Sequence, residues 1–267
     1  MDLKLSHICM AEVFPNMVKV TTSGFGKHAG GGQRGEVTGF SHESRKRMLE
    51  MINSLEFERV TFVTLTYPAV FPEDGRQVKE HLRRFRARIE KKFGHLRIVW
   101  RMEYQQRGAP HFHLIILDAP FICRWWLSKA WVDSNDTKSW LNFRYGSNIK
   151  GIANKGDSRK VINYVCKYAG KEEEHERDDT NSWCGRFWGK WNFEKQIPDR
   201  YSFDPGEAVS VVAGLVSARG SDQTWQPRNS LACTIFGGSV GSGDYGRIVG
   251  DSLQAFGATR CNGELDS

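Results

Sequence analysis

The segment from Arg101 to Leu117 constrains the fold of this chain more than any other. It contains two strand-like runs joined by a short Gln-Arg-Gly-Ala turn, a pattern that predicts an antiparallel hairpin. The second run contains His111, Phe112 and His113. Because successive side chains of a strand point to opposite faces, both histidines project from one face while Phe112 enters the core.

The histidine pair and an acidic residue on the preceding strand predict a site for a divalent ion. His111, His113 and Glu103 together would form a three-ligand cup. A register slip by one residue would turn Glu103 away from this face, and Gln105 or Gln106 would then be the fallback ligand. Histidines at this spacing also occur as ordinary strand residues, so the pair alone does not decide the matter.

The chain around the hairpin alternates between strand and helix patterns. Residues 59–67 are rich in β-branched and aromatic residues and end at Pro68, which predicts a strand. From Arg76 to Phe93 apolar residues recur at spacings of four and three, which predicts a helix that Gly94 ends. Further elements are expected as helices over 41–55, 120–131 and about 157–170, and as strands over 96–104, 110–117, 147–153 and 207–218.

This order of elements favours an α+β fold. Because the second and third strands form a hairpin, a parallel βαβ repeat fits poorly, and we expect a helix-backed antiparallel sheet of the ferredoxin-like or RRM-like type. The open face of such a sheet is a common binding surface for single-stranded nucleic acid.

The distribution of glycine and apolar residues divides the chain into three parts. Residues 1–40 are expected to be a flexible N-terminal arm, because the Gly-rich stretch Ser23–Gly39 has few apolar positions. Residues 41–218 are expected to form the domain. Residues 219–267 are rich in Gly, Ser and polar residues and are expected to be a disordered tail.

The formal net charge of +7 favours a polyanionic partner, although a basic enzyme of another kind has the same balance. Arg84 and Arg88 lie on the polar side of the predicted helix, and Arg107 lies in the hairpin turn. We expect these three to contact the DNA backbone, with a solvated amphipathic face as the alternative.

Cysteine spacing and hydropathy indicate the cellular compartment. The six cysteines are scattered and lack zinc-finger spacing, which is typical of reduced thiols. The sequence has no apolar run of about 18 residues, the length needed to cross a membrane. We therefore expect a cytoplasmic protein without a membrane partner.

Two tyrosines and two lysines recur at helical spacing in one short segment. A spacing of four places Tyr164 and Tyr168 on one face of a helix, and the same holds for Lys167 and Lys171. In the alternative interpretation one tyrosine packs in the core, the other covers its edge, and the lysines are solvated. The presence of the histidine pair in the same chain favours a catalytic role.

Three motifs in this order resemble those of the HUH endonucleases. Thr64–Tyr67 resembles the first motif, Pro110–His113 the metal motif and Tyr164–Lys171 the tyrosine motif. Within that superfamily the chain is most similar to the two-tyrosine class, the rolling-circle replication initiators of small single-stranded DNA phages and plasmids. The resemblance covers about residues 60–171 and implies the sheet known as the HUH palm.

The resemblance implies a site-specific endonuclease and strand transferase that nicks and joins single-stranded DNA. A tyrosine, Tyr164 or Tyr168, would attack a phosphodiester to give a 5′-phosphotyrosine and a free 3′-hydroxyl that primes replication. Lys167 and Lys171 would favour the phenolate and hold the phosphate. Mg²⁺ or Mn²⁺ in the predicted cup would polarise that phosphate.

The implied partner is single-stranded DNA at a replication origin, in a bacterial host cell if a phage or plasmid encodes the chain. The sequence contains no Walker A motif, so we expect a host helicase and polymerase to act with it. A transposase or relaxase of the same superfamily is one alternative, and a non-catalytic RRM-like nucleic-acid-binding module is another of a different class.

Overall fold

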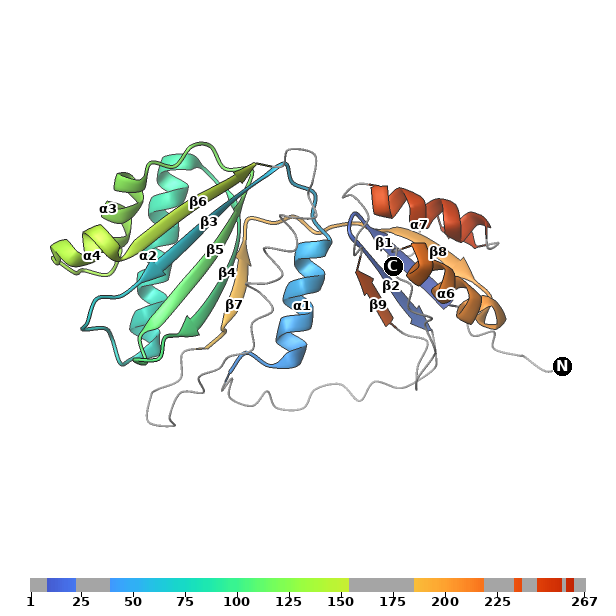
Figure 1. Ribbon diagram of the computed structural model, residues 1–267, viewed down its shortest axis with the longest axis horizontal. Helices are drawn as coiled ribbons and strands as arrows, with labels where there is room; N and C mark the ends of the chain where they lie inside the picture. The colour runs from blue at the N-terminus through green and yellow to red at the C-terminus, as the bar shows by residue number, and fades with distance from the viewer. Residues whose placement is uncertain are drawn as a thin grey trace.

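The described residues form two antiparallel sheets with helices packed on them. The computed structural model describes residues 9–22, 39–153, 185–218, 233–236, 244–255 and 258–261. Each sheet has five strands, and every strand pair is antiparallel. The predicted α+β fold with a helix-backed antiparallel sheet is therefore confirmed. Figure 1 shows the sheets side by side.

The first sheet contains the predicted hairpin and has the strand order β6-β3-β5-β4-β7. Its strands are β3 (Arg59–Thr66), β4 (Arg97–Tyr104), β5 (Pro110–Leu117), β6 (Ser147–Ala153) and β7 (Trp188–Trp191). The helices beside it are α1 (His42–Asn53), α2 (Gly75–Phe93), α3 (Arg124–Ser134) and α4 (Trp140–Tyr145).

The two faces of the first sheet differ in how far they are covered. On one face Leu65, Phe112 and Leu114 are fully buried and pack with Phe85 of α2 and Trp131 of α3. On the opposite face α1 covers the apolar half of the strands, and residues of α1 and of the strands form one buried cluster there: Met48, Ile52, Leu55, Val60, Val99, Ile115 and Leu117. The other half of that face carries polar side chains.

A glycine in a left-handed conformation closes the β4–β5 hairpin. Gly108 has φ of +76°, which side chains disfavour, and its N–H donates to the carbonyl of Gln105 at 2.7 Å. The N–H of Gln105 in turn donates to the carbonyl of Ala109 at 3.0 Å. These bonds fix the register that places Glu103 opposite His111.

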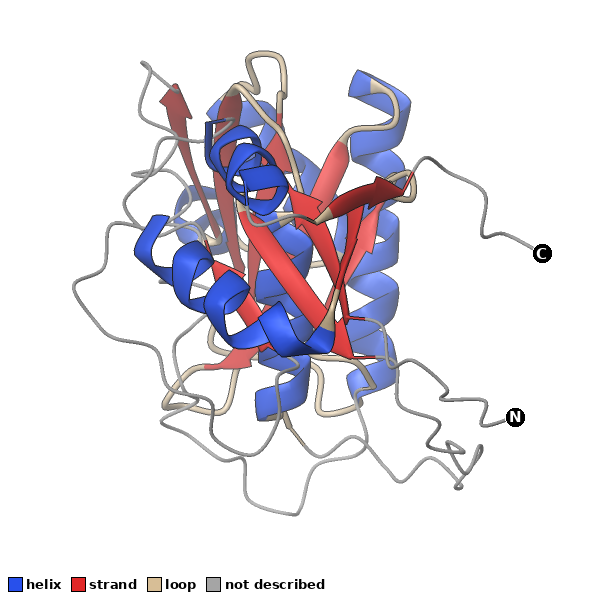
Figure 2. Cartoon of the chain, turned by 90° about the vertical axis from the view of Figure 1, so that its right-hand side faces the viewer, coloured by secondary structure: helices blue, strands red, loops and turns tan. Residues whose placement is uncertain are grey.

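The second sheet has the order β10-β8-β1-β2-β9. Its strands are β1 (Cys9–Phe14), β2 (Met17–Thr22), β8 (Asp199–Phe203), β9 (Cys233–Phe236) and β10 (Thr259–Cys261), and the short 3₁₀ helix η1 (Pro205–Glu207) leads into α6 (Ala208–Ala218), with α7 (Asp244–Ala255) further along the chain. Figure 2 views the molecule from this side, where two helices lie in front of the strands.

The second sheet differs from the expected arm and tail. Residues 9–22, expected to be part of a flexible arm, form the β1–β2 hairpin, because Cys9, Ala11 and Val13 alternate into a buried face. Residues 233–236 and 259–261, expected to be part of a disordered tail, pair as β9 and β10.

The strand expected over residues 207–218 is a helix, so that prediction was wrong. Its buried residues Val211, Val212 and Leu215 follow helical spacing and pack in the core of the second sheet with Val249 and Leu253 of α7. The valine content resembles a strand, but tertiary packing overrides it.

The turn of the β1–β2 hairpin contacts the end of α1. Asn16 donates its backbone N–H to the carbonyl of Asn53 at 3.1 Å and its side-chain amide to that of Leu55 at 3.1 Å. These bonds link the second sheet to the helix that covers the first. Within the described residues no helix is both long and apolar enough to cross a membrane.

Candidate metal centre

The strand register brings the three predicted ligands together on the uncovered half of the first sheet. Glu103 lies opposite His111 across β4 and β5, and His113 lies two residues further along the same face. Nε2 of His113 is 2.7 Å from Oε1 of Glu103, and the two imidazole centroids are 4.6 Å apart. One ligand atom from each residue lies within 4.8 Å of those of the other two.

The donor set suits a divalent ion. Two imidazole nitrogens and one carboxylate oxygen are ligands that Mg²⁺, Mn²⁺ and similar ions share, and three protein ligands leave coordination positions for water or substrate. All three side chains are half-buried, so they are held by their surroundings and still reach the surface. Among the described residues this is the one group of three such side chains that could hold a metal.

Thr66 fixes the orientation of His111. Its hydroxyl oxygen lies 2.7 Å from Nδ1 of His111. With the proton on Nδ1, that nitrogen donates to Thr66 and Nε2 keeps a lone pair for an ion, an arrangement typical of metal-binding histidines. Thr66 is itself held on both sides, because its N–H donates to Gly146 at 2.8 Å and its carbonyl accepts from Nε1 of Trp131 at 2.9 Å.

The environment keeps both kinds of ligand in the form that binds a cation. Burial, followed by the charge of neighbouring His113, lowers the pKa of His111 to about 4, so this imidazole is neutral at physiological pH. Burial opposes ionisation of Glu103, but the hydrogen bond to His113 and the charges around it outweigh burial and hold its pKa below the ordinary value. Glu103 therefore supplies a negative charge to the centre.

Arg101 is a charged neighbour of the centre that the sequence did not single out as part of it. It lies opposite His113 on the same face, is 1% exposed, and places Nη2 3.9 Å from Oε2 of Glu103. Its guanidinium also lies over the ring of Phe40 at 4.7 Å. The signals were present, since Arg101 is two residues from Glu103 and Thr66 shares the period-two face with Thr64.

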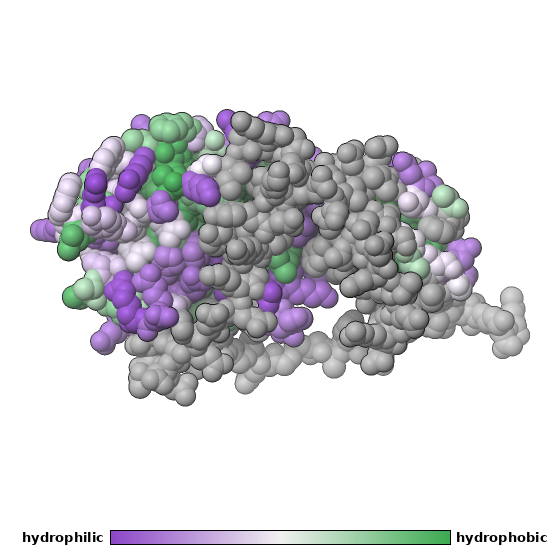
Figure 3. All heavy atoms as spheres, in the orientation of Figure 1, coloured by the Kyte–Doolittle hydropathy of each residue, from purple (hydrophilic) through white to green (hydrophobic). Residues whose placement is uncertain are grey.

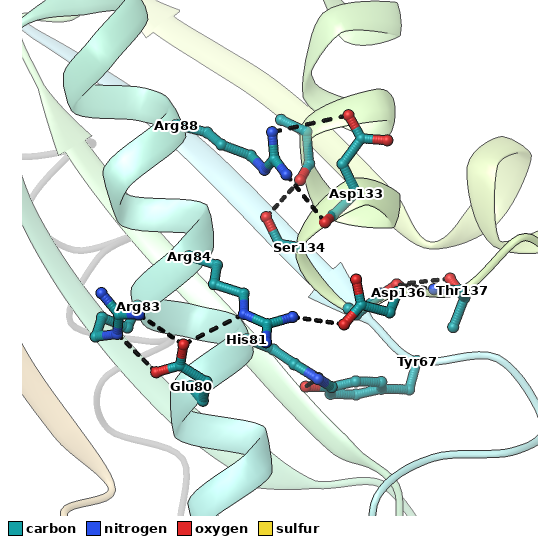
Figure 4. Close-up of polar contacts among 12 residues, drawn as sticks. Tyr67, Glu80, His81, Arg83, Arg84, Arg88, Asp133, Ser134, Asp136 and Thr137 are labelled. Atoms are coloured by element: carbon teal, nitrogen blue, oxygen red, sulfur yellow. Dashed lines mark hydrogen bonds and ion pairs between the residues drawn. The ribbon is translucent and has the colours of Figure 1, made fainter.

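Arg84 and Arg88, predicted to contact DNA, lie on the far side of the first sheet. Figure 4 shows both reaching from α2 towards α3 and the turn after it. Arg84 forms an ion pair with Asp136, and Arg88 donates to the backbone carbonyl of Asp133 at 3.1 Å. Since α2 packs on the face opposite the histidines, the structure does not bring these arginines to the centre, and their contact with DNA stays a prediction.

Arg107 has a structural role in the hairpin turn. It donates to the backbone carbonyl of Pro68 at 2.7 Å and to that of Tyr67 at 2.6 Å, and to the side chain of Gln105 at 3.0 Å. These bonds join the turn to the segment after β3. A phosphate contact by Arg107 would compete with them and also stays a prediction.

The predicted catalytic helix lies outside the described residues. This applies to Tyr164, Lys167, Tyr168 and Lys171, whose roles stay predictions. Tyr67, which ends the first motif, packs in the core: it is 2% exposed and its hydroxyl lies 3.0 Å from Nδ1 of buried His81.

Comparison with known proteins adds a family to this geometry. The model of the replication-associated protein family of the ORF2 type matches residues 60–173, the part of the chain that contains the metal centre. The chain is also similar to a protein of Xylella fastidiosa (strain 9a5c) that is named "Putative replication protein", with 27% identity over 176 residues. These matches support a Rep-type replication protein.

The similarity to the Xylella protein has a limited extent. It covers 60% of this chain and 58% of the relative, so the chain spans less than two thirds of that protein. No solved structure gave a significant match. The Rep-type assignment thus rests on sequence, and the metal centre is the structural feature that lies inside the matched segment.

Proposed function

We propose that this chain is a metal-dependent endonuclease and strand transferase that nicks and rejoins single-stranded DNA at an origin and so starts rolling-circle replication. The observation that carries the proposal is the cluster of Glu103, His111 and His113 on one face of the first sheet. The cluster lies within the segment that matches the replication-associated family.

Glu103, His111 and His113 would hold Mg²⁺ or Mn²⁺. When bound, the ion supplies Lewis-acid polarisation of the scissile phosphate and neutralises charge that develops on it. The chain's own contribution is to keep the ligands in place: Thr66 orients His111, and the hydrogen bond between Glu103 and His113 holds the other two side chains together.

The covalent step is assigned to Tyr164 and Tyr168. A phenolate oxygen attacks phosphorus, the bond from phosphorus to the 3′-oxygen breaks, and a 5′-phosphotyrosine and a 3′-hydroxyl result. The proton released by the phenol balances the one gained by the 3′-oxygen. Because the bond energy is conserved in the ester, a 3′-hydroxyl can later attack it and reseal the strand.

The lysines address the weak acidity of tyrosine. A phenol has an ordinary pKa of about 10 and is a poor nucleophile at neutral pH. Lys167 and Lys171, each three residues after a tyrosine, would stabilise the phenolate and bind the phosphate. A host helicase and polymerase would complete replication from the free 3′-end.

The test is formation of a covalent complex with single-stranded DNA taken from beside the gene. Wild-type chain with Mn²⁺ is expected to give an adduct that survives denaturing electrophoresis. Each single change, Tyr164→Phe or Tyr168→Phe, should leave some adduct, and the double change should leave none. Tyr67→Phe is the matched control and should retain the adduct, because Tyr67 is buried in the core.

Two outcomes would contradict the proposal. Peptide mapping that finds the DNA on another tyrosine, for example Tyr104, would remove the catalytic role from residues 164–171. Binding of single-stranded DNA without any adduct would favour a non-catalytic nucleic-acid-binding module.

A further inference from the structure

Aromatic side chains are exposed together at the edge of the first sheet, on α3 and α4. Trp125 is 49% exposed, Trp140 67% and Tyr145 72%. Phe143 stacks with two of them: its ring centroid lies 5.8 Å from that of Trp125 at 16° between planes, and 5.5 Å from that of Trp140 at 26°. We call Trp125, Trp140, Phe143 and Tyr145 the aromatic platform. Figure 3 shows hydrophobic surface at this end of the molecule, where α4 lies in Figure 1.

The aromatic platform is accompanied by positive charge. The guanidinium groups of Arg124 and Arg144 lie over the ring of Trp125 at 5.8 and 5.9 Å. Both arginines are exposed, and the chain from 137 to 150 contains Lys138, Arg144 and Lys150 but no Asp or Glu. The potential at this surface therefore favours an anion.

The aromatic platform is continuous with the metal centre. Tyr145 is followed by Gly146, whose carbonyl accepts the N–H of Thr66 at 2.8 Å, and Thr66 contacts His111. The next residues form β6, which pairs with β3 along the edge of the same sheet. The end of α4 thus lies two hydrogen bonds from a predicted ligand.

We propose that the aromatic platform binds the bases of single-stranded DNA next to the phosphodiester at the metal centre, with Arg124 and Arg144 contacting its phosphates. This inference rests on the proposed function, since it assigns a further part of the same substrate. Parallel, exposed rings accept bases by stacking whatever their sequence, and arginines beside them add cation–π and phosphate contacts.

A protein partner is the competing occupant, because protein interfaces are also rich in aromatic residues and arginine. Two observations favour DNA. The segment from 137 to 150 lacks acidic residues, and the platform adjoins the centre at which a phosphodiester would be cut. The flat stacking of Phe143 with Trp125 and Trp140 matches the geometry of successive bases.

The experiment compares two DNA probes by fluorescence anisotropy, in the full chain without added metal so that no cleavage occurs. One probe is an oligothymidylate of about 15 nucleotides, and the other is an abasic strand of equal length. The double change Trp140→Ala and Tyr145→Ala is expected to lower affinity for oligothymidylate about 10-fold or more and to leave abasic binding unchanged, because stacking contributes about 1–3 kcal/mol per base.

Three controls accompany that variant. Trp140→Phe with Tyr145→Phe keeps the rings and should restore most of the affinity. Ile197→Ala removes an equally exposed apolar side chain elsewhere, 88% exposed, and should change neither probe. Arg144→Gln should weaken both probes alike and flatten the dependence of affinity on salt.

Equal loss for both probes, or no loss for either, would overturn the inference. Sedimentation of the wild-type chain as an oligomer that the double alanine change dissociates, with oligothymidylate affinity unaltered, would assign the platform to a protein partner and overturn it too. The covalent adduct tests the proposed function separately. Base-dependent binding without an adduct leaves the platform standing, and an adduct with base-independent binding leaves the enzyme standing.

Discussion

The two faces of the first sheet are made by alternate residues of the same strands, yet they serve different ends. On the face under α2 and α3, Phe112, Leu114 and their neighbours are fully buried and apolar. On the other face, His111 and His113 are half-buried and hydrogen-bonded to polar side chains. The stability of the sheet and the chemistry of the centre can therefore be changed separately.

The largest expected effect is on the apolar face. Phe112→Ala should reduce the free energy of unfolding by about 3–5 kcal/mol, because it leaves a cavity beside Trp100 and Trp131, which its ring contacts. Urea denaturation measures this loss. His113→Ala, one residue along on the polar face, should cost about 1 kcal/mol. Equal losses for the two variants would break the comparison.

A smaller effect is expected where the polar face orients a ligand. Thr66→Val preserves shape but removes the hydroxyl that contacts Nδ1 of His111. Affinity for Mn²⁺ should fall about 10- to 100-fold, as for other partners of metal-binding histidines, with the melting temperature little changed. Thr64→Val on the same face is the matched control and should keep wild-type affinity.

The apolar face contains a buried histidine that should make stability sensitive to acid. Burial lowers the pKa of His81 below the ordinary value of 6.5, so the unfolded chain takes up this proton at higher pH than the folded chain. The stability that this histidine contributes is full above pH 6.5 and declines as pH falls towards its folded pKa.

His81→Gln can still accept from the hydroxyl of Tyr67 but cannot titrate in this range. The variant should therefore lose less stability than the wild type between pH 7 and about pH 5. Parallel pH profiles of the free energy of unfolding for the two proteins would contradict this assignment.

The smallest effect is expected at the surface of α2. Arg84→Gln removes exposed ion pairs with Glu80 and Asp136 and should change the free energy of unfolding by less than about 1 kcal/mol. The same variant decides the predicted DNA contact. A flatter salt dependence of single-stranded DNA binding would confirm it, and an unchanged slope would limit Arg84 to the contact between α2 and α3.

The parts of the fold that could be predicted from sequence are those whose partners lie nearby in the chain. The β4–β5 hairpin follows from local alternation and a glycine turn, and it sets the register of Glu103 and His111 without further information. The alternation of Cys9, Ala11 and Val13 is equally visible in the sequence. It does not predict a sheet by itself, because β8, which pairs with β1, follows about 190 residues later and no local pattern points to it.

The same reason explains what the sequence does not predict at the centre. Thr66 and Arg101 both lie on predicted strands, but their roles depend on which neighbours face them across the sheet. The aromatic platform brings together residues of two helices whose packing the sequence does not reveal.

Calorimetric titration of the chain with Mn²⁺ tests the central claim, that Glu103, His111 and His113 hold a divalent ion, most directly. We predict a single Mn²⁺ per chain, lost in the double change His111→Ala and His113→Ala and retained in His81→Gln, whose histidine lies on the other face. Wild-type stoichiometry and affinity in the double variant would contradict the claim, and so would a wild-type chain that binds no Mn²⁺.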